Sequence, residues 1–122
     1  MTRQEYISQW NDLFTIYVNA TLGMIADWMS QPGISKEWNN RFEALKFLLE
    51  GKDVSDVKAD IAQGIVTDKT LDKTERVYSE IGNFFIEFSV KGDTEKECLK
   101  VLFRQYEHYR KQMTKLELNV LN

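Results

Sequence analysis

Apolar residues recur at alternating steps of three and four towards the end of the chain, and this spacing constrains the fold more than any other feature. The seven residues of this seam are Leu99, Leu102, Tyr106, Tyr109, Met113, Leu116 and Val120. Steps of three and four place side chains on one face of an α-helix. Thr94 and Glu97 form a capping box before the seam, in which each side chain pairs a free backbone N–H. The sequence therefore predicts an amphipathic helix over residues 94–119.

Similar spacing predicts four further helices. They comprise a long N-terminal helix over residues 3–30, followed by helices over 36–50, 54–63 and 68–91. Thr2 with Glu5 caps the first of these helices, and Ser35 caps the second. The short connection over residues 91–93 makes the last two helices an antiparallel C-terminal hairpin. The expected fold is all-α, a compact up-and-down bundle of about five helices in a single domain, residues 1–122.

Residues 84–90 leave helix and strand both open. Phe84, Ile86, Phe88 and Val90 alternate with other residues as in a strand, and their types are common in strands. A lone strand would have no partner elsewhere in the sequence, so the helix is favoured.

Composition and cysteine content indicate the class of protein and the cellular compartment. The chain has 122 residues, of which 43% are hydrophobic and 29% charged, as expected of one globular domain. Cys98 is the only cysteine, so no disulfide forms within the chain. No apolar run resembles a signal peptide, and the uncharged stretch over residues 13–26 is shorter than the roughly 20 residues of a membrane span. We expect a cytoplasmic protein that does not enter a membrane.

Residues suited to catalysis or metal binding are few. Cys98 and His108 lie ten residues apart on one predicted helix, about 15 Å along its axis, which is too far for a nucleophile–base pair. Asp53, Asp56 and Asp60 form the best oxygen-ligand cluster. Carboxylates are also common at the start of a helix, where they face the positive end of its dipole. We therefore expect no enzymatic activity, no cofactor and no metal.

A basic ridge lies opposite the seam on the last predicted helix. Its members, which share a sector of roughly 120° on a helical wheel, are Lys96, Lys100, Arg104, His108, Lys111 and Lys115. Glu107 interrupts this sector. Such a ridge suits a phosphate backbone or an acidic protein, although many charged helix faces serve only solvation. Tyr106 and Tyr109 face the seam, which disfavours stacking of single-stranded bases.

Apolar residues suggest additional interfaces. Trp10, Trp28 and Trp38 are expected in the core, and any of them that is exposed would be a candidate binding anchor. The first predicted helix carries two apolar rows, more than one neighbouring helix covers. A homodimer through the first or last helix is therefore an open alternative to a monomer.

The charge distribution leads to the functional hypothesis. The formal net charge is −3, and residues 1–60 carry this whole deficit, with six basic and nine acidic side chains. The first hypothesis is a small acidic protein-binding module without catalysis, such as an inhibitor, an immunity protein or a phage or plasmid accessory protein that occludes a partner. Its acidic half would steer it towards a basic partner such as a nuclease. The alternative is a protein that contacts nucleic acid through the basic ridge.

Overall fold

The computed structural model describes residues 2–86 and 93–121. Its five helices are α1 (Arg3–Met29), α2 (Lys36–Leu49), α3 (Lys52–Gln63), α4 (Asp68–Ile86) and α5 (Asp93–Leu121). No strand occurs among the described residues, which confirms the predicted all-α class. Of the stretch with two interpretations, residues 84–86 are helical and belong to α4. Residues 87–90 lie outside the described part of the chain.

Two of the predicted caps start their helices as expected. The Thr2 hydroxyl accepts a hydrogen bond from the Glu5 backbone N–H at 3.1 Å. The Ser35 hydroxyl accepts one from the Trp38 N–H at 3.2 Å. Both bonds occupy N–H groups that have no partner within the helix. Helix α5 is described from Asp93, one residue before its predicted start, and the predicted cap by the Thr94 side chain lies outside the described part of the chain.

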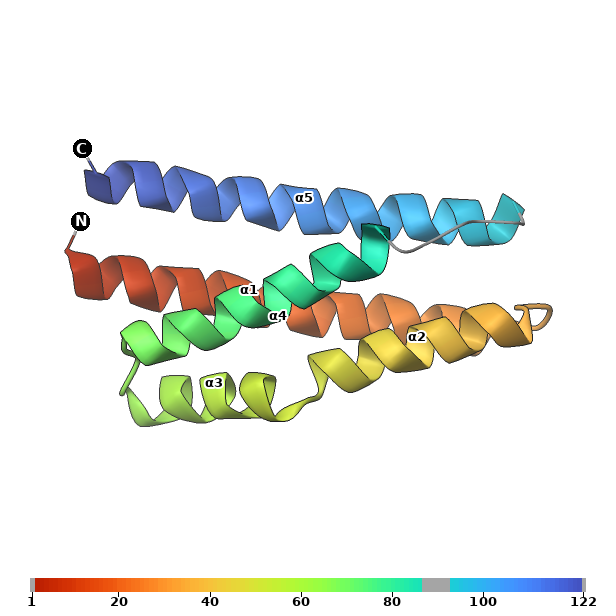
Figure 1. Ribbon diagram of the computed structural model, residues 1–122, viewed down its shortest axis with the longest axis horizontal. Coiled ribbons are helices and arrows are strands. Elements are labelled where there is room, and N and C mark those ends of the chain that lie inside the picture. The colour runs from red at the N-terminus through yellow and green to blue at the C-terminus, as the bar shows by residue number, and fades with distance from the viewer. Residues whose placement is uncertain (1, 87–92, 122) are drawn as a thin grey trace.

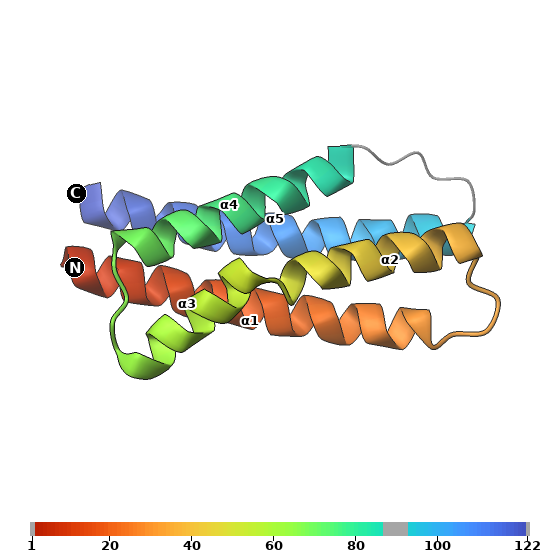
Figure 2. The same ribbon diagram turned by 60° about the horizontal axis from the view of Figure 1, so that its bottom comes forward.

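Helices α2 and α3 follow one another end to end and together fill one position of the bundle (Figures 1 and 2). The bundle thus has four helical positions, which corrects the expected arrangement of about five. The break falls at Glu50 and Gly51. A Cβ atom on Gly51 would lie 3.2 Å from the carbonyl oxygen of Leu48. Glycine therefore lets α3 start directly against the end of α2.

The chain runs up and down the bundle, and both described ends lie at the same end of the molecule (Figure 1). Helix α1 is central and contacts all four other helices. The backbone of α5 lies closest to α1, and these two long helices are antiparallel. Helix α4 also runs antiparallel to α5 but reaches it mainly through side chains, such as Phe85 and Phe103, whose ring centroids are 5.4 Å apart. The predicted C-terminal hairpin is therefore looser than expected, because α1 takes the place beside α5.

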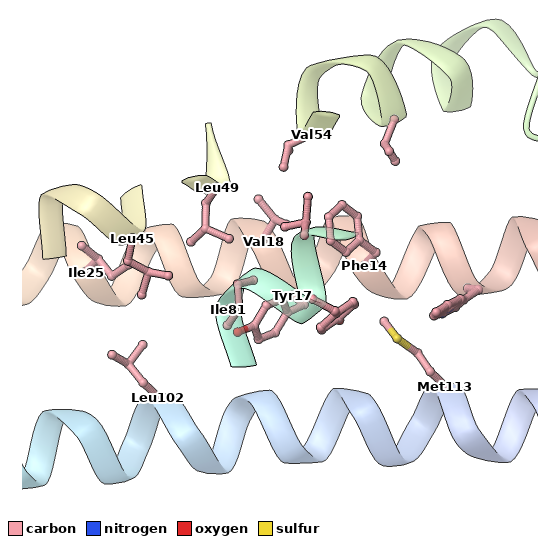
Figure 3. Close-up of a cluster of buried hydrophobic side chains, with 14 of the residues drawn as sticks. Phe14, Tyr17, Val18, Ile25, Leu45, Leu49, Val54, Ile81, Leu102 and Met113 are labelled. Atoms are coloured by element: carbon pink, nitrogen blue, oxygen red, sulfur yellow. The ribbon is translucent and has the colours of Figure 1, made fainter. Parts of the chain in front are cut away.

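One continuous hydrophobic core joins the four positions (Figure 3). Helix α1 contributes one side of it, and each other helix adds residues that point inwards. Figure 3 labels Phe14, Tyr17, Val18, Ile25, Leu45, Leu49, Val54, Ile81, Leu102 and Met113. The seam of α5 faces this core, since Leu102 and Met113 are buried and its other described members are half-buried. Burial of this seam fixes which face of α5 is left to solvent.

Tyrosines hold α1, α4 and α5 together at the centre of the core. The Tyr17 ring lies 5.2 Å from that of Tyr78 and 5.6 Å from that of Tyr109, measured between centroids. The Tyr106 hydroxyl donates a hydrogen bond to the Tyr78 carbonyl oxygen at 3.2 Å. The Tyr78 hydroxyl is buried and has no hydrogen-bond partner in the described part of the chain. Burial raises the pKa of both Tyr17 and Tyr78 above the usual value of a tyrosine.

Candidate partner-binding site

The basic ridge lies on the solvent-facing side of α5. Its exposed side chains are Lys96, Lys100, Arg104, His108, Lys111 and Lys115. The Lys100 ammonium pairs with the Glu97 carboxylate at 3.4 Å. The other five side chains form no ion pair with any described residue. The ridge is therefore a row of five lysine and arginine cations and one imidazole on one rigid helix, and most of the positive charge is left to solvent or to a partner.

An exposed aromatic ring borders the ridge on the side of α4. Phe103 remains 42% exposed although its ring packs against Phe85 and Tyr106. It lies three residues after Lys100 and four before Glu107, so these side chains are neighbours on the helix surface. Phe103 was not predicted from the sequence, because it falls between the seam and the ridge on the helical wheel. Its step of four from Leu99 is the only signal in the sequence that pointed to it.

The arginine beside the ridge has a structural contact. Arg110 extends over the Tyr78 ring, with 5.4 Å between its guanidinium carbon and the ring centroid. This cation–π contact ties α5 to α4. Arg110 therefore belongs to the helix interface, in agreement with its place next to the seam in the sequence.

Two of the three tryptophans are not available as binding anchors. Trp10 and Trp38 are buried in the core, as expected, so neither is the exposed side chain that a binding anchor requires. Trp10 packs in the core against Tyr6 and Tyr78, and the Trp38 ring meets that of Phe42. Only Trp28 remains half-buried. It lines a hollow of about 620 Å³ between the end of α1, the following loop and the start of α5.

That hollow joins apolar residues with one carboxylate, Glu97, and one thiol, Cys98. Its walls are largely apolar, with Trp28, Ile34, Cys98 and Val101 among the lining residues. Cys98 is buried there, whereas His108 lies on the exposed ridge ten residues further along α5. The structure thus keeps the thiol and the imidazole apart, as their sequence separation predicted.

The acidic cluster of α3 serves contacts with α4. The Asp53 carboxylate pairs with the Arg76 guanidinium at 3.3 Å. Asp56 pairs with Lys73 at 3.7 Å. The Asp60 carboxylate accepts a hydrogen bond from the Thr70 hydroxyl at 2.8 Å. Each carboxylate thus has its own partner on the neighbouring helix, and the three do not converge on one point.

Two further kinds of site are absent from the described part of the chain. Histidine, cysteine and carboxylate side chains do not gather there in groups of three or more that could hold a metal ion. None of the described helices has the length and apolarity needed to cross a membrane. Comparisons of this chain with protein-family models, with curated proteins and with solved structures gave no match.

Proposed function

We propose that this chain is a protein-binding module without catalytic activity, and that the basic ridge of α5 binds an acidic surface of a partner protein. The observation that carries this proposal is the exposed row of basic side chains, of which only Lys100 pairs with a described carboxylate, with Phe103 at its border. A half-exposed aromatic ring surrounded by charged side chains is a common arrangement in protein interfaces. A module of this kind inhibits or regulates its partner by covering the surface to which it binds.

The position of the ridge favours binding. Seam residues of α5 pack on α1 and α4, so the helix cannot rotate and the cations keep fixed positions. A row of positive charges held along one face of a fixed helix speeds association with a surface of opposite charge. A face that served only solvation would have no need of an exposed phenylalanine beside it.

A protein partner fits the ridge better than nucleic acid does. The net charge of the chain is −3, whereas domains that bind nucleic acid usually carry a clear basic excess. Glu97 and Glu107 lie at the ridge and would approach a phosphate backbone. Among the described phenylalanine, tyrosine and tryptophan rings beside the ridge, Phe103 alone has more than a third of its surface exposed, whereas Tyr106 and Tyr109 pack inwards. Stacking of successive bases requires a series of accessible rings.

The test compares two matched triple variants as baits. The ridge variant carries Lys100→Gln, Arg104→Gln and Lys111→Gln, and the control carries Lys36→Gln, Lys52→Gln and Lys69→Gln. Both sets remove three exposed positive charges and keep side-chain length and helix propensity. Proteins retained from a lysate of the native cells by wild type and control, but lost by the ridge variant and at high salt, would support the proposal.

Direct titration separates the two classes of macromolecule. Short duplex DNA and single-stranded RNA are titrated with wild type and with the ridge variant, with fluorescence anisotropy as the readout. We expect only weak binding, at a Kd above roughly 1 μM at physiological salt, as is usual for non-specific contacts. Tighter, salt-sensitive binding that disappears in the ridge variant would contradict the proposal and establish nucleic acid as the ligand.

A further inference from the structure

An open groove runs between α1 and α5 on the surface of the bundle. Its volume is about 500 Å³, and Leu13, Ile16 and Leu116 form its apolar part. Ile16 is 52% exposed even though it lies in the middle of the longest helix contact of the molecule. The groove therefore leaves apolar surface of the two longest helices in water, which is unfavourable for an isolated chain.

The two walls of the groove carry opposite charges. Asp12 lines it from α1, and Lys115 lines it from α5. Neither side chain forms an ion pair with a described residue. Side-chain amides of Gln9, Gln112 and Asn119 complete the rim, and each can both donate and accept hydrogen bonds. A partner of one charge sign would be repelled by one wall, whereas a second copy offers both signs.

We propose that this groove is the interface of a homodimer, in which a second copy of the chain binds with α1 of each subunit over α5 of the other. A two-fold axis parallel to the two helices gives this arrangement. It brings Asp12 against Lys115 of the partner subunit, and symmetry makes the same pair twice. A two-fold axis across the helices, centred on the groove, would instead place Asp12 against a second Asp12. Charge therefore selects the axis parallel to the helices.

Gly23 supplies an independent observation on the same face of α1. It follows Ile16 by seven residues, two helical turns, and therefore lies on the same side of the helix. Glycine inside a helix costs roughly 0.5–1 kcal/mol relative to alanine. A Cβ atom at this position would have no atom within 4 Å, so packing inside the chain does not require glycine. Gly23 does not line the groove itself but a shallow hollow between α1 and α2, together with Lys46 and Glu50. In the proposed dimer the second subunit extends over this part of α1, and its close approach would account for the glycine.

The dimer does not depend on the proposed function of the ridge. Lys115 lies at the edge of the ridge that borders the groove. On the helical wheel, Lys96, Lys100 and Lys111 lie on the side away from the groove. These three residues would stay accessible in the dimer, which would display them twice, whereas Lys115 would lie in the interface. Failure of one proposal therefore leaves the other intact.

Charge reversal tests the proposed pairing on the full chain. Sedimentation equilibrium would be measured for wild type, Asp12→Lys, Lys115→Glu and the double variant that carries both changes. Wild type should dimerise, and each single reversal should raise the dimer Kd about tenfold or more, because like charges then face each other twice. The double variant restores both pairs and should regain most of the affinity. This regain separates lost pairing from lost folding.

Neutral substitutions distinguish the two axes. In the proposed dimer, Asp12→Asn and Lys115→Gln each remove an attraction and weaken dimerisation. With the axis across the helices they would remove repulsion and strengthen it, and that result would overturn the proposed geometry.

Two substitutions of exposed isoleucines test whether the groove is the dimer interface. Ile16→Lys should abolish the dimer, whereas Ile65→Lys, at a position of similar exposure (54%) in the α3–α4 connection, should leave it unchanged. Circular dichroism at low concentration would verify that each variant is folded. A wild type that stays monomeric up to roughly 1 mM, the affinity range of the weakest specific contacts, would overturn the dimer. So would a folded double reversal that fails to regain affinity.

Discussion

The hydroxyl group of Tyr78 is buried without a hydrogen-bond partner in the described part of the chain, while the Tyr78 ring packs on all sides. Tyr78→Phe keeps those ring contacts and removes only the unpaired polar atom. We expect the free energy of unfolding to stay the same or to rise by up to about 1–2 kcal/mol, because a buried hydroxyl without a partner is costly. Urea unfolding of the two proteins would measure this change.

Tyr106→Phe is the matched control. It deletes the same atom from a tyrosine whose hydroxyl does have a partner, the Tyr78 carbonyl oxygen. The free energy of unfolding should fall by about 0.5–1.5 kcal/mol, the usual net contribution of one hydrogen bond. A loss for Tyr78→Phe as large as that for Tyr106→Phe would show that the Tyr78 hydroxyl is hydrogen-bonded after all.

Single residues were predicted best where helical spacing leaves one interpretation. The seam of α5 packs on the core, which sets the rotation of the helix about its axis. The ridge on the opposite side of α5 therefore faces solvent. The tryptophans were harder, since apolar residues occur on most sides of α1 and spacing does not tell which side stays open. The structure resolves this by burying Trp10 and exposing Ile16. The acidic residues of α3 found partners only once α4 was in place.

At the scale of elements, the Thr70 side chain connects the start of α4 to the end of α3 through hydrogen bonds. Its hydroxyl donates to the Asp60 carboxylate at 2.8 Å and accepts from the Thr67 backbone N–H at 3.1 Å. Thr70→Val keeps the shape of the side chain but removes both bonds. Because Thr70 is fully buried, we expect the free energy of unfolding to fall by about 1–3 kcal/mol. Chemical denaturation would measure the loss.

Thr114→Val provides the control for this substitution. Thr114 is exposed on α5, and its hydroxyl donates only to the Arg110 carbonyl oxygen of its own helix. The same chemical change should alter stability there by no more than about 0.5 kcal/mol. Equal losses at both positions would contradict a special role for Thr70 and would indicate a general effect of valine in helices.

Replacing the helical glycines Gly23 and Gly82 by alanine is expected to change stability by different amounts. Gly23→Ala meets no neighbouring atom and should stabilise the monomer by roughly 0.5–1 kcal/mol through better helix propensity. If α1 contacts a second subunit there, the same change should weaken dimerisation. Thermal melts at low concentration and sedimentation at high concentration would measure the two effects. A stabilised monomer with unchanged dimer affinity would place Gly23 outside the interface.

Gly82→Ala is the internal comparison. A Cβ atom there would lie 3.1 Å from the Tyr106 hydroxyl oxygen, which is tighter than an ordinary contact. The gain in helix propensity should therefore be offset, and Gly82→Ala should stabilise the chain less than Gly23→Ala does. Gly82 has a reason inside the fold, whereas Gly23 has none.

The helices themselves were largely predictable, and their arrangement was less so. Caps at Thr2 and Ser35 are local signals, so the starts of α1 and α2 agree with the sequence to within a residue. The collinear path of α2 and α3 depends on how Gly51 packs against carbonyl groups of the preceding turn. The seam of α5 has two apolar neighbours, α1 and α4, and its backbone lies closest to α1. Helical spacing shows which face of a helix is apolar but not which helix covers that face. Neither the path of α2 and α3 nor the position of α5 therefore follows from spacing alone.

At the scale of the whole molecule, the tyrosines that join three helices make stability depend on alkaline pH. Tyr17 and Tyr78 are neutral in both states below about pH 10 and contribute no pH dependence there. Burial raises the pKa of both in the folded chain. As pH rises past about 10, the unfolded chain loses these protons first and so binds fewer protons than the folded chain. The free energy of unfolding must therefore fall with rising pH, by up to about 1.4 kcal/mol per pH unit for each group.

Lysines also titrate at alkaline pH, so wild type alone would not assign this slope to the core. The comparison with Tyr78→Phe does, because the two chains carry the same lysines and differ in one titrating group. Urea unfolding at several pH values above 10 should show a slope smaller in the variant by up to about 1.4 kcal/mol per pH unit. The variant should therefore gain stability over wild type as pH rises, beyond any gain at neutral pH. Parallel pH profiles of the two proteins would mean that the Tyr78 hydroxyl ionises as easily in the folded chain as in the unfolded one. The burial of this hydroxyl between α1, α4 and α5 would then be contradicted.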